Sequence, residues 1–259
     1  DFSGGLGNYK WVKTEDQSWT LWSEKFDENC HSLSGAREET RYNFIEGCEL
    51  ALFDEEYEQV NVLEVGFGLA VGLEETFQTW NERFKHDLNF VSFELDAKLV
   101  EAYIHQRADR KQWEYFNDPL PYYLWQNQQG DRLFKAYILI GDGRETLPLA
   151  KQKGLLPSAF HAIFQDPFSP KKNPDLWTVE WFELLAQLSH REAILSTYSA
   201  SYSVRKGLIE AGWTIENRKG FKQKKSSTRA FLSTKKKDTP LMREIQKARI
   251  SPLRDENLK

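Results

Sequence analysis

A short glycine-rich stretch carries the first chemical signal in the sequence. Gly66, Gly68 and Gly72 follow an apolar, β-branched run at residues 60–65. Glycines in a strand-to-helix turn let the backbone approach a ligand closely and adopt positive φ angles. The third glycine comes one residue later than in the dinucleotide fingerprint, and Glu64 stands just before the turn. A carboxylate there would repel a pyrophosphate and would suit a cationic, phosphate-free nucleoside, so the expected cofactor is S-adenosylmethionine.

Acidic residues end the next two runs of strand-like sequence. Glu94 follows residues 90–93, and Asp142 follows residues 137–140. Glu94 could accept hydrogen bonds from both ribose hydroxyls, as the corresponding acid does in dinucleotide folds, and Asp142 could accept one from the adenine amino group. Acids at strand ends also cap helices, so each is weak evidence alone. With the glycine-rich turn they form an ordered series that favours a nucleoside cofactor.

A further run, residues 162–164, leads into the candidate catalytic group, Asp166. Two prolines stiffen the loop that follows it. An amine must be neutral to attack a sulfonium methyl group, and Asp166 could orient such an amine and accept its proton. Phe168 in the same loop, or Tyr198 after the next run, could stack on a flat base. The structural alternative is a turn capped by an aspartate.

These strand ends belong to an alternation of strands and helices. Between the first two strand-like runs, Leu73, Phe77, Trp80 and Phe84 recur at helical spacing. The alternation predicts a Rossmann-like α/β fold, in which a mostly parallel sheet carries helices on both faces. Ligands bind beyond the carboxyl ends of the strands in such sheets, which is where the acids stand.

The two ends of the chain depart from this alternation. Residues 213–215 and 229–232 predict a C-terminal antiparallel hairpin, because no helical stretch separates them. Residues 9–14 and 18–23 predict an N-terminal β-hairpin, and a helix is expected from about 38 to 53. The expected division is an N-terminal hairpin-and-helix appendage at 1–57, a methyltransferase domain at 58–234 and a charged tail at 235–259.

The net charge hides an asymmetry. The 259 residues carry a formal net charge of −4, yet residues 218–237 contain nine Lys or Arg and no Asp or Glu. The rest of the chain holds 26 basic residues against 39 acidic ones. An acidic body with one basic segment indicates a directed contact with an anion such as nucleic acid, although a solvated charged loop has the same composition. The lysines expected to contact phosphates are Lys219, Lys222, Lys224 and Lys225.

Several classes of protein are excluded by what the sequence lacks. No apolar run approaches the roughly 20 residues that a membrane-spanning helix needs, and no signal peptide is visible. Two cysteines cannot form a disulfide framework, so a reducing cytoplasm is expected. The five histidines show no paired ligand spacing, so no metal site is expected. Ser199 and Ser201 lack a nucleophile-elbow setting, which argues against a hydrolase.

Taken together, the motifs resemble those of the MnmC-type methyltransferases, which complete 5-methylaminomethyl-2-thiouridine at the wobble position of tRNA. The similarity runs from about residue 33 to residue 232. It is carried by the stretches 34–47, 64–68, 141–142, 166–177, 207–213 and 218–225. The resemblance implies a Rossmann-like methyltransferase core, S-adenosylmethionine as cofactor, and an aminomethyl-uridine of tRNA as acceptor.

The resemblance also implies roles for particular residues. Asp166 matches the acid near the acceptor amine, with Phe168 and Tyr198 as its expected aromatic companions, and Glu64 and Gly66 match the cofactor loop. The residues expected to bind the cofactor are Glu39, Glu64, Gly66, Phe67, Gly68, Glu94, Asp142 and Asp166. Some members of the family carry a fused flavin oxidase that prepares the amine. This chain has no room for one, so the amine is expected from another enzyme.

Asp166 is followed by a proline where the family often has Gly or Ala. This sequence is closer to the loops of other amino-methyltransferases.

Two other functions remain open at this stage. An aminopropyl transferase related to spermidine synthase would share the sheet and the acids, but its cationic acceptor would gain nothing from the basic segment. A non-catalytic RNA-binding module would not need the intact series of Glu64, Glu94, Asp142 and Asp166.

Overall fold

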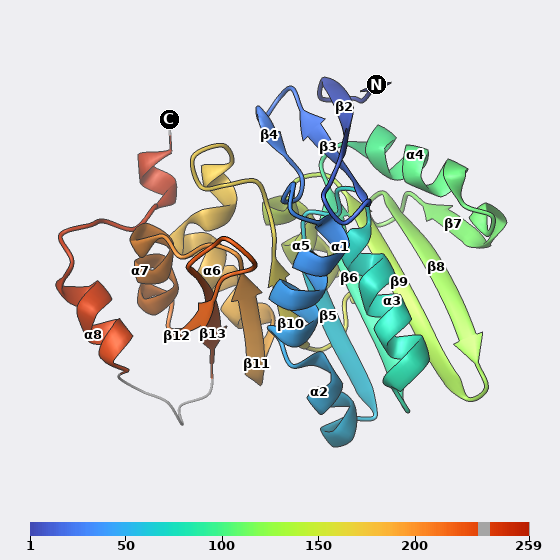
Figure 1. Cartoon of the computed structure of the whole chain (residues 1–259). Helices are drawn as coiled ribbons and strands as arrows, with labels where there is room; N and C mark the ends of the chain where they lie inside the picture. Colours follow the sequence, from blue (N-terminus) through green and yellow to red (C-terminus); the bar gives the residue numbers. More distant parts are fainter. Residues whose placement is uncertain (233–238, 259) are drawn as a thin grey trace.

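The computed structural model describes residues 1–232 and 239–258, and a nine-stranded sheet forms its centre (Figure 1). The five inner strands run parallel to one another. In spatial order they are β11 (Ser189–Thr197), β10 (Phe160–Gln165), β5 (Gln59–Val65), β6 (Asp87–Glu94) and β9 (Arg132–Ile140). Each contains one of the strand-like runs of the sequence. The side chains of β5, β6 and β10 are almost entirely buried, as expected for parallel strands covered on both faces.

The two edges of the sheet are antiparallel. The C-terminal hairpin is confirmed as β12 (Thr214–Lys219) and β13 (Ser226–Phe231). Because β13 is antiparallel to β11, β12 runs parallel to the inner strands, and its carboxyl end lies at the same edge as theirs. At the opposite edge, β8 (Tyr122–Gln129) pairs with β9 and with β7 (Trp113–Phe116). The sequence reading did not predict these last two strands.

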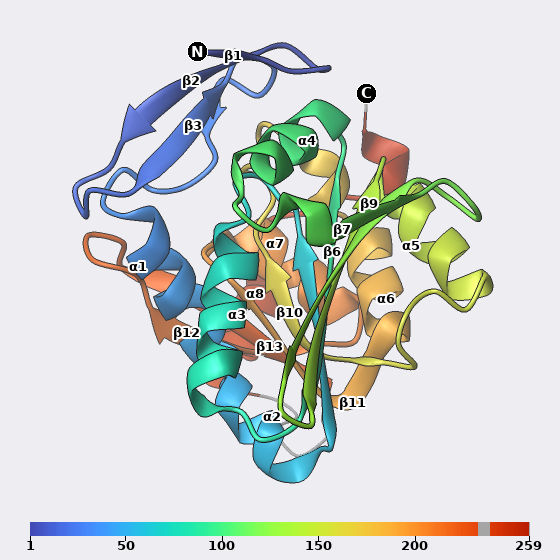
Figure 2. The same cartoon turned by 90° about the vertical axis from the view of Figure 1, so that its right-hand side faces the viewer.

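Helices cover both faces of the sheet, as predicted (Figure 2). Each face has its own apolar core. One core contains residues of α2 (Leu50–Glu56), α3 (Val71–Arg83) and α4 (Ala97–Gln106). The other contains residues of α5 (Gly143–Gln152), α6 (Val179–Leu188), α7 (Tyr202–Glu210) and α8 (Pro240–Lys247). Within the described residues, no helix is both long and apolar enough to cross a bilayer.

The helix expected from about 38 to 53 is broken into three parts. They are α1 (Ala36–Thr40), the π-helical turn η1 (Arg41–Glu46) and α2. Glu49, just before α2, adopts a φ of +53°, which ends the preceding turn. Phe44 and Phe53 belong to the same core as β5, so these segments pack directly on the sheet.

The domain boundary at residue 57 stays a prediction. Of the expected C-terminal tail, residues 235–238 and 259 lie outside the described residues, whereas Ile245 of α8 is fully buried.

The N-terminal hairpin is confirmed and is part of a larger antiparallel sheet. The four strands are β1 (Phe2–Ser3), β2 (Asn8–Lys13), β3 (Trp19–Ser23) and β4 (Glu28–Asn29). This small sheet lies above the carboxyl ends of the parallel strands (Figure 1). Asp96, the N-cap of α4, fastens it there: the carboxylate accepts hydrogen bonds from Gly5 N, Leu6 N and the Tyr9 hydroxyl, at 2.9, 3.1 and 3.0 Å.

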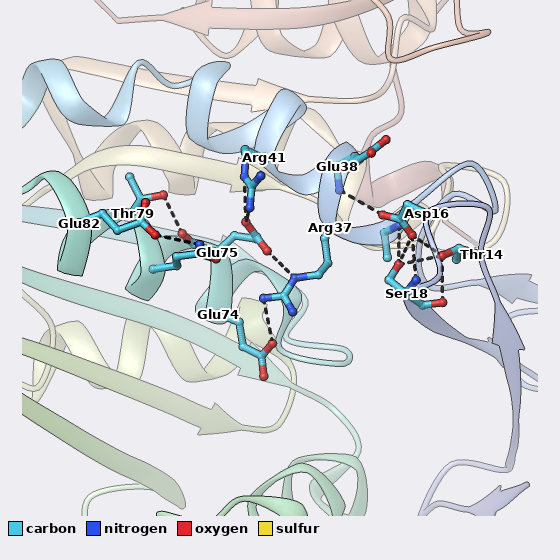
Figure 3. Close-up of polar contacts among 12 residues, drawn as sticks. Thr14, Asp16, Ser18, Arg37, Glu38, Arg41, Glu74, Glu75, Thr79 and Glu82 are labelled. Atoms are coloured by element: carbon cyan, nitrogen blue, oxygen red, sulfur yellow. Dashed lines mark hydrogen bonds and ion pairs between the residues drawn. The ribbon is translucent and has the colours of Figure 1, made fainter.

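Ion pairs with α3 fix the position of α1 (Figure 3). Arg37 and Arg41 both donate to the carboxylate of Glu75 in α3, whose side chain is only 1% exposed. On its other side, α1 begins against the turn of the β2–β3 hairpin, where Asp16 accepts from Glu38 N and Ser18 accepts from Ala36 N. Helix α1 therefore holds a fixed position between the small sheet and α3.

We predict that the variant carrying Arg37→Met and Arg41→Met loses roughly 1–3 kcal/mol of unfolding free energy, because Glu75 is left buried without its donors. Urea denaturation measures this loss. Glu74→Gln is the matched control: Glu74 also pairs with Arg37, but its side chain is 37% exposed, so its loss should stay below about 1 kcal/mol. Equal losses in the two variants would contradict a structural role for Glu75.

Candidate active site

The glycine-rich turn connects β5 to α3 and is fixed to the end of β6. Gly66 and Gly68 have φ angles of +91° and +51°. Glycine adopts such positive φ angles readily, whereas a residue with a side chain would be strained there. The carboxylate of Glu94, the last residue of β6, accepts a hydrogen bond from Gly68 N at 3.0 Å and another from Asp96 N at 3.0 Å. Burial raises the pKa of Glu94 to about 7, although these backbone donors oppose the rise. The Glu94 carboxylate therefore contacts the glycine-rich turn, as expected from its position at the end of the second strand-like run.

Gly72, the third glycine of the turn, makes room for the carboxylate of Glu64. A Cβ atom at Gly72 would lie 1.7 Å from Oε1 of Glu64, so no larger residue fits there while Glu64 keeps its position. Glu64 is 4% exposed, and its Oε2 atom has no hydrogen-bond partner among the described residues. Burial raises the pKa of Glu64 to about 8; the nearby Ser92 hydroxyl opposes this rise, and the charge of Glu94 adds to it. A buried, unpartnered carboxylate is costly, so Glu64 is poised for a ligand that brings a donor or a positive charge.

A hollow of about 320 Å³ opens at the carboxyl ends of the strands, within the range of small-molecule sites. It brings together most of the residues that the sequence singled out, from four different strand ends. Those lining it are Glu64, Gly66, Phe67, Gly68, Glu94, Asp142, Asp166 and Phe168. Asp142 also caps α5, accepting from Arg144 N at 2.9 Å, so both the capping and the binding interpretation fit its position. A nucleoside with a positive charge suits the carboxylates gathered at these strand ends.

The small N-terminal sheet and the turns next to it form one wall of this hollow, a contribution that the sequence did not predict. Tyr9, Lys25, Phe26, Cys30 and His31 all line it. Their spacing shows no motif. The available signal was the alternating pattern of the hairpin, which predicts the strands but not where they dock. The position of the small sheet depends on its hydrogen bonds to Asp96. In the sequence, the position of Asp96 indicates only a helix cap.

Asp166 directly follows β10 and lies where two hollows meet. It lines the 320 Å³ hollow and also a second one of about 210 Å³. Burial raises the pKa of Asp166 well above its usual range, the negative charges of Glu39 and Glu64 raise it further, and Lys224 opposes them. The loop after Asp166 is held by two side chains: the Tyr198 hydroxyl donates to Pro167 O, and Trp177 Nε1 donates to Phe168 O, both at 2.8 Å. The carboxylate therefore sits on a fixed loop between two spaces.

The aromatic residues near Asp166 already have partners within the protein. Phe168 stacks on Phe26 of the small sheet, with ring centroids 4.3 Å apart and planes inclined by 20°. Tyr198 has its hydroxyl engaged, and the Lys224 ammonium lies 4.9 Å from its ring centroid. Both residues line the second hollow, but one face of the Phe168 ring is covered by the protein itself. Stacking of either ring on a base stays a prediction.

Glu39 is placed differently from what was expected of a cofactor ligand. It does not line the first hollow; it lines the second, together with Asp166, Tyr198 and Lys224. Its Oε2 atom accepts from Ser32 N and its Oε1 atom from the Lys224 ammonium, both at 2.8 Å. Helix α1 carries Glu39 to this position, and the sequence gives no sign of where the start of that helix packs.

The loop between β12 and β13 lies beside the second hollow, as the parallel direction of β12 requires. Lys224 lines the hollow, and Lys222 pairs with Glu38 of α1 at 2.8 Å. Lys219 and Lys225 are exposed. Within residues 218–237, the lysines at 235–237 lie outside the described residues. The basic loop is thus placed at the mouth of the site.

Comparisons with known proteins agree with this geometry. Residues 110–233 match a family described as S-adenosyl-L-methionine-dependent methyltransferase. The tRNA 5-methylaminomethyl-2-thiouridine biosynthesis bifunctional protein MnmC of Azoarcus sp. is 31% identical over 226 residues, which are 81% of this chain and 34% of that protein. The protein of that name in Aliivibrio fischeri is 29% identical over 239 residues, 84% of this chain and 34% of that protein. The chain therefore spans about a third of the length of these relatives.

A solved structure is similar over nearly the whole chain. The crystal structure of MnmC2 from Aquifex aeolicus superposes with a TM-score of 0.73 at 26% sequence identity. The superposition covers 98% of this chain and 81% of that one. The similarity therefore includes the parallel sheet and the N-terminal residues that close the first hollow.

We predict that Glu64→Gln stabilises the ligand-free protein more at pH 8.5 than at pH 5.5. The pKa of Glu64 rises from an ordinary value of 4.5 to about 8 in the folded protein, so between these pH values the folded protein keeps a proton that the unfolded chain loses. Stability therefore falls as the pH rises from about 4.5 to about 8 and levels off above that. The amide cannot ionise and escapes this loss. The gain should reach a few kcal/mol, at about 1.4 kcal/mol per pKa unit. Urea denaturation of both proteins at the two pH values measures it; the same difference at both would show that Glu64 has an ordinary pKa.

Proposed function

We propose that this chain is an S-adenosyl-L-methionine-dependent methyltransferase of the MnmC type and that it methylates the amine of a 5-aminomethyl-uridine at the tRNA wobble position. The product is 5-methylaminomethyl-uridine. The observation that carries the proposal is the position of Asp166 at the junction of two hollows. We assign one hollow to the methyl donor and the other to the acceptor. The methyl group and the amine must then meet beside Asp166, which lines both hollows.

The first hollow would hold the methyl donor. S-adenosyl-L-methionine, when bound, supplies an electrophilic methyl group on a positively charged sulfur. We propose that Glu64 provides its free carboxylate oxygen to the ammonium end of the ligand, and that Glu94 and Asp142 accept from the ribose hydroxyls and the adenine amino group. The glycine-rich turn supports this assignment because Gly66 and Gly68 expose backbone to the hollow. The small N-terminal sheet would exclude water from the opposite side.

Asp166 would act on the acceptor amine. The amine nitrogen forms its new bond to the methyl carbon while the sulfur–carbon bond breaks, which leaves S-adenosyl-L-homocysteine. The nitrogen needs a free lone pair for this attack, so one proton must leave the amine. A carboxylate whose pKa is raised toward neutrality is a suitable proton acceptor, and burial raises the pKa of Asp166 in that direction.

The basic loop supports an RNA acceptor. Phosphate contacts supply most of the affinity of proteins for nucleic acid, and the loop lies beside the second hollow rather than on the far face. We propose that Lys219, Lys222, Lys224 and Lys225 contact phosphates that flank the wobble base. The relatives whose names mention tRNA are consistent with this choice. The enzyme would then act in the cytoplasm, on an amine that another enzyme prepares.

The proposal is tested with an anticodon stem-loop RNA that carries 5-aminomethyl-uridine at the wobble position. We expect the protein and S-adenosyl-L-methionine to convert it to 5-methylaminomethyl-uridine, as measured by mass spectrometry of the nucleosides, and to leave the same RNA with plain uridine unmodified. Asp166→Asn should lower the single-turnover rate by roughly 10²–10⁴-fold with little change in cofactor affinity.

Two outcomes would count against this account. If the wild-type protein leaves the aminomethyl RNA unmodified, the acceptor is wrong. If Asp166→Asn keeps more than about a tenth of the wild-type rate, Asp166 is structural and the proton leaves by another route.

A further inference from the structure

A primary ammonium group of the protein itself, that of Lys224, already lines the second hollow. The Nζ atom of Lys224 lies 2.8 Å from Oε1 of Glu39 and 4.9 Å from the centroid of the Tyr198 ring. Lys224 and Asp166 line the same hollow. A carboxylate on one side and an aromatic face on another are the features that recognise an alkylammonium ion.

The carboxylate that holds this ammonium is built into the fold. The Glu39 side chain is 9% exposed, whereas that of Lys224 is 45% exposed. The Oε2 atom of Glu39 is fixed by Ser32 N, and α1, which carries Glu39, is fixed by the pairs of Arg37 and Arg41 with Glu75. The acid therefore stays in place, while the more exposed lysine is the partner that can leave.

Lys224 is carried by a tightly folded loop. A Cβ atom at Gly220 would lie 2.3 Å from the carbonyl oxygen of Lys224, so the glycine permits the close approach that turns the loop back on itself. Lys222, two residues earlier, pairs with Glu38, which is 53% exposed and does not line the hollow. The two lysines thus pair with neighbouring glutamates, and only the pair of Lys224 with Glu39 lines the second hollow.

We propose that the second hollow is a binding site for the ammonium form of the acceptor, that Glu39 is its specificity-determining carboxylate, and that Lys224 occupies the site until the acceptor displaces it. This inference rests on the proposed amine acceptor. The arriving aminomethyl group carries the same charge and the same CH₂–NH₃⁺ end as a lysine side chain, so it can take over the contacts with Glu39 and Tyr198. The released lysine then faces the RNA backbone, and the acceptor amine stands next to Asp166.

The test compares two stem-loop RNAs that differ only at the wobble base, one with 5-aminomethyl-uridine and one with uridine. The readout is the ratio of their dissociation constants, measured in the presence of S-adenosyl-L-homocysteine. Both RNAs have the same phosphates, so any phosphate contact of Lys224 cancels in the ratio. We expect the wild-type protein to prefer the aminomethyl RNA.

The variants should move this preference in opposite directions. Lys224→Met removes the competing ammonium but keeps the aliphatic stem, so the preference should rise by up to about fivefold, the effect of a partly exposed ion pair. Glu39→Gln should reduce the preference to near one. Lys222→Met is the matched control from the same loop: it should weaken both RNAs alike and leave the ratio unchanged.

The outcomes separate this inference from the proposed function. If the wild-type protein prefers the aminomethyl RNA but neither Lys224→Met nor Glu39→Gln changes the ratio, the ammonium site is elsewhere and this inference is wrong. If Lys222→Met changes the ratio as much as Lys224→Met does, the effect belongs to the loop as a whole and the inference is again wrong. If the wild-type protein binds both RNAs equally, the ammonium site is contradicted, whereas the proposed acceptor is contradicted only if the aminomethyl RNA is left unmethylated.

Discussion

A cluster of buried carboxyl groups at the carboxyl ends of the parallel strands, costly to ionise without a positive partner, is the constraint on which the rest of the site depends. Glu64, Glu94 and Asp166 come from β5, from β6 and from the loop after β10, and the parallel direction of the strands places them at one edge. Burial raises the pKa of each of the three. Such carboxylates are destabilising while they lack positive partners. A sulfonium donor and an ammonium acceptor are the partners that the proposed reaction brings.

The site is closed by elements outside the parallel sheet. The small N-terminal sheet is held by Asp96, and α1 is held by Glu75, so two buried acids set the position of both walls. Phe26 from one of these elements covers Phe168, and Glu39 from the other pairs with Lys224. The donor side and the acceptor side therefore each combine a strand end with a segment from the first 40 residues. We infer that the N-terminal segment is part of the active site.

The parts of the fold that follow from local patterns were predictable. Apolar runs ending in glycine or acid marked four of the five parallel strands, and the ordered acids marked the first hollow. The edge strand β8 was missed because half of its residues are polar and its burial does not alternate strictly along the strand, and β7 was missed with it. Glu39 was assigned to the cofactor because it lies in a matching stretch. Its position near Asp166 depends on how α1 packs between the small sheet and α3, and no local pattern encodes such long-range packing.

The most direct test of this account is the number of protons released when the ligand binds. Isothermal titration calorimetry at pH 7, in two buffers of different ionisation enthalpy, would compare S-adenosyl-L-methionine with S-adenosyl-L-homocysteine, which lacks the sulfonium charge. If buried carboxylates with raised pKa values surround the donor, the sulfonium lowers those pKa values, and the charged ligand should release more protons than the neutral thioether. Equal proton release by the two ligands, or none by either, would contradict the account.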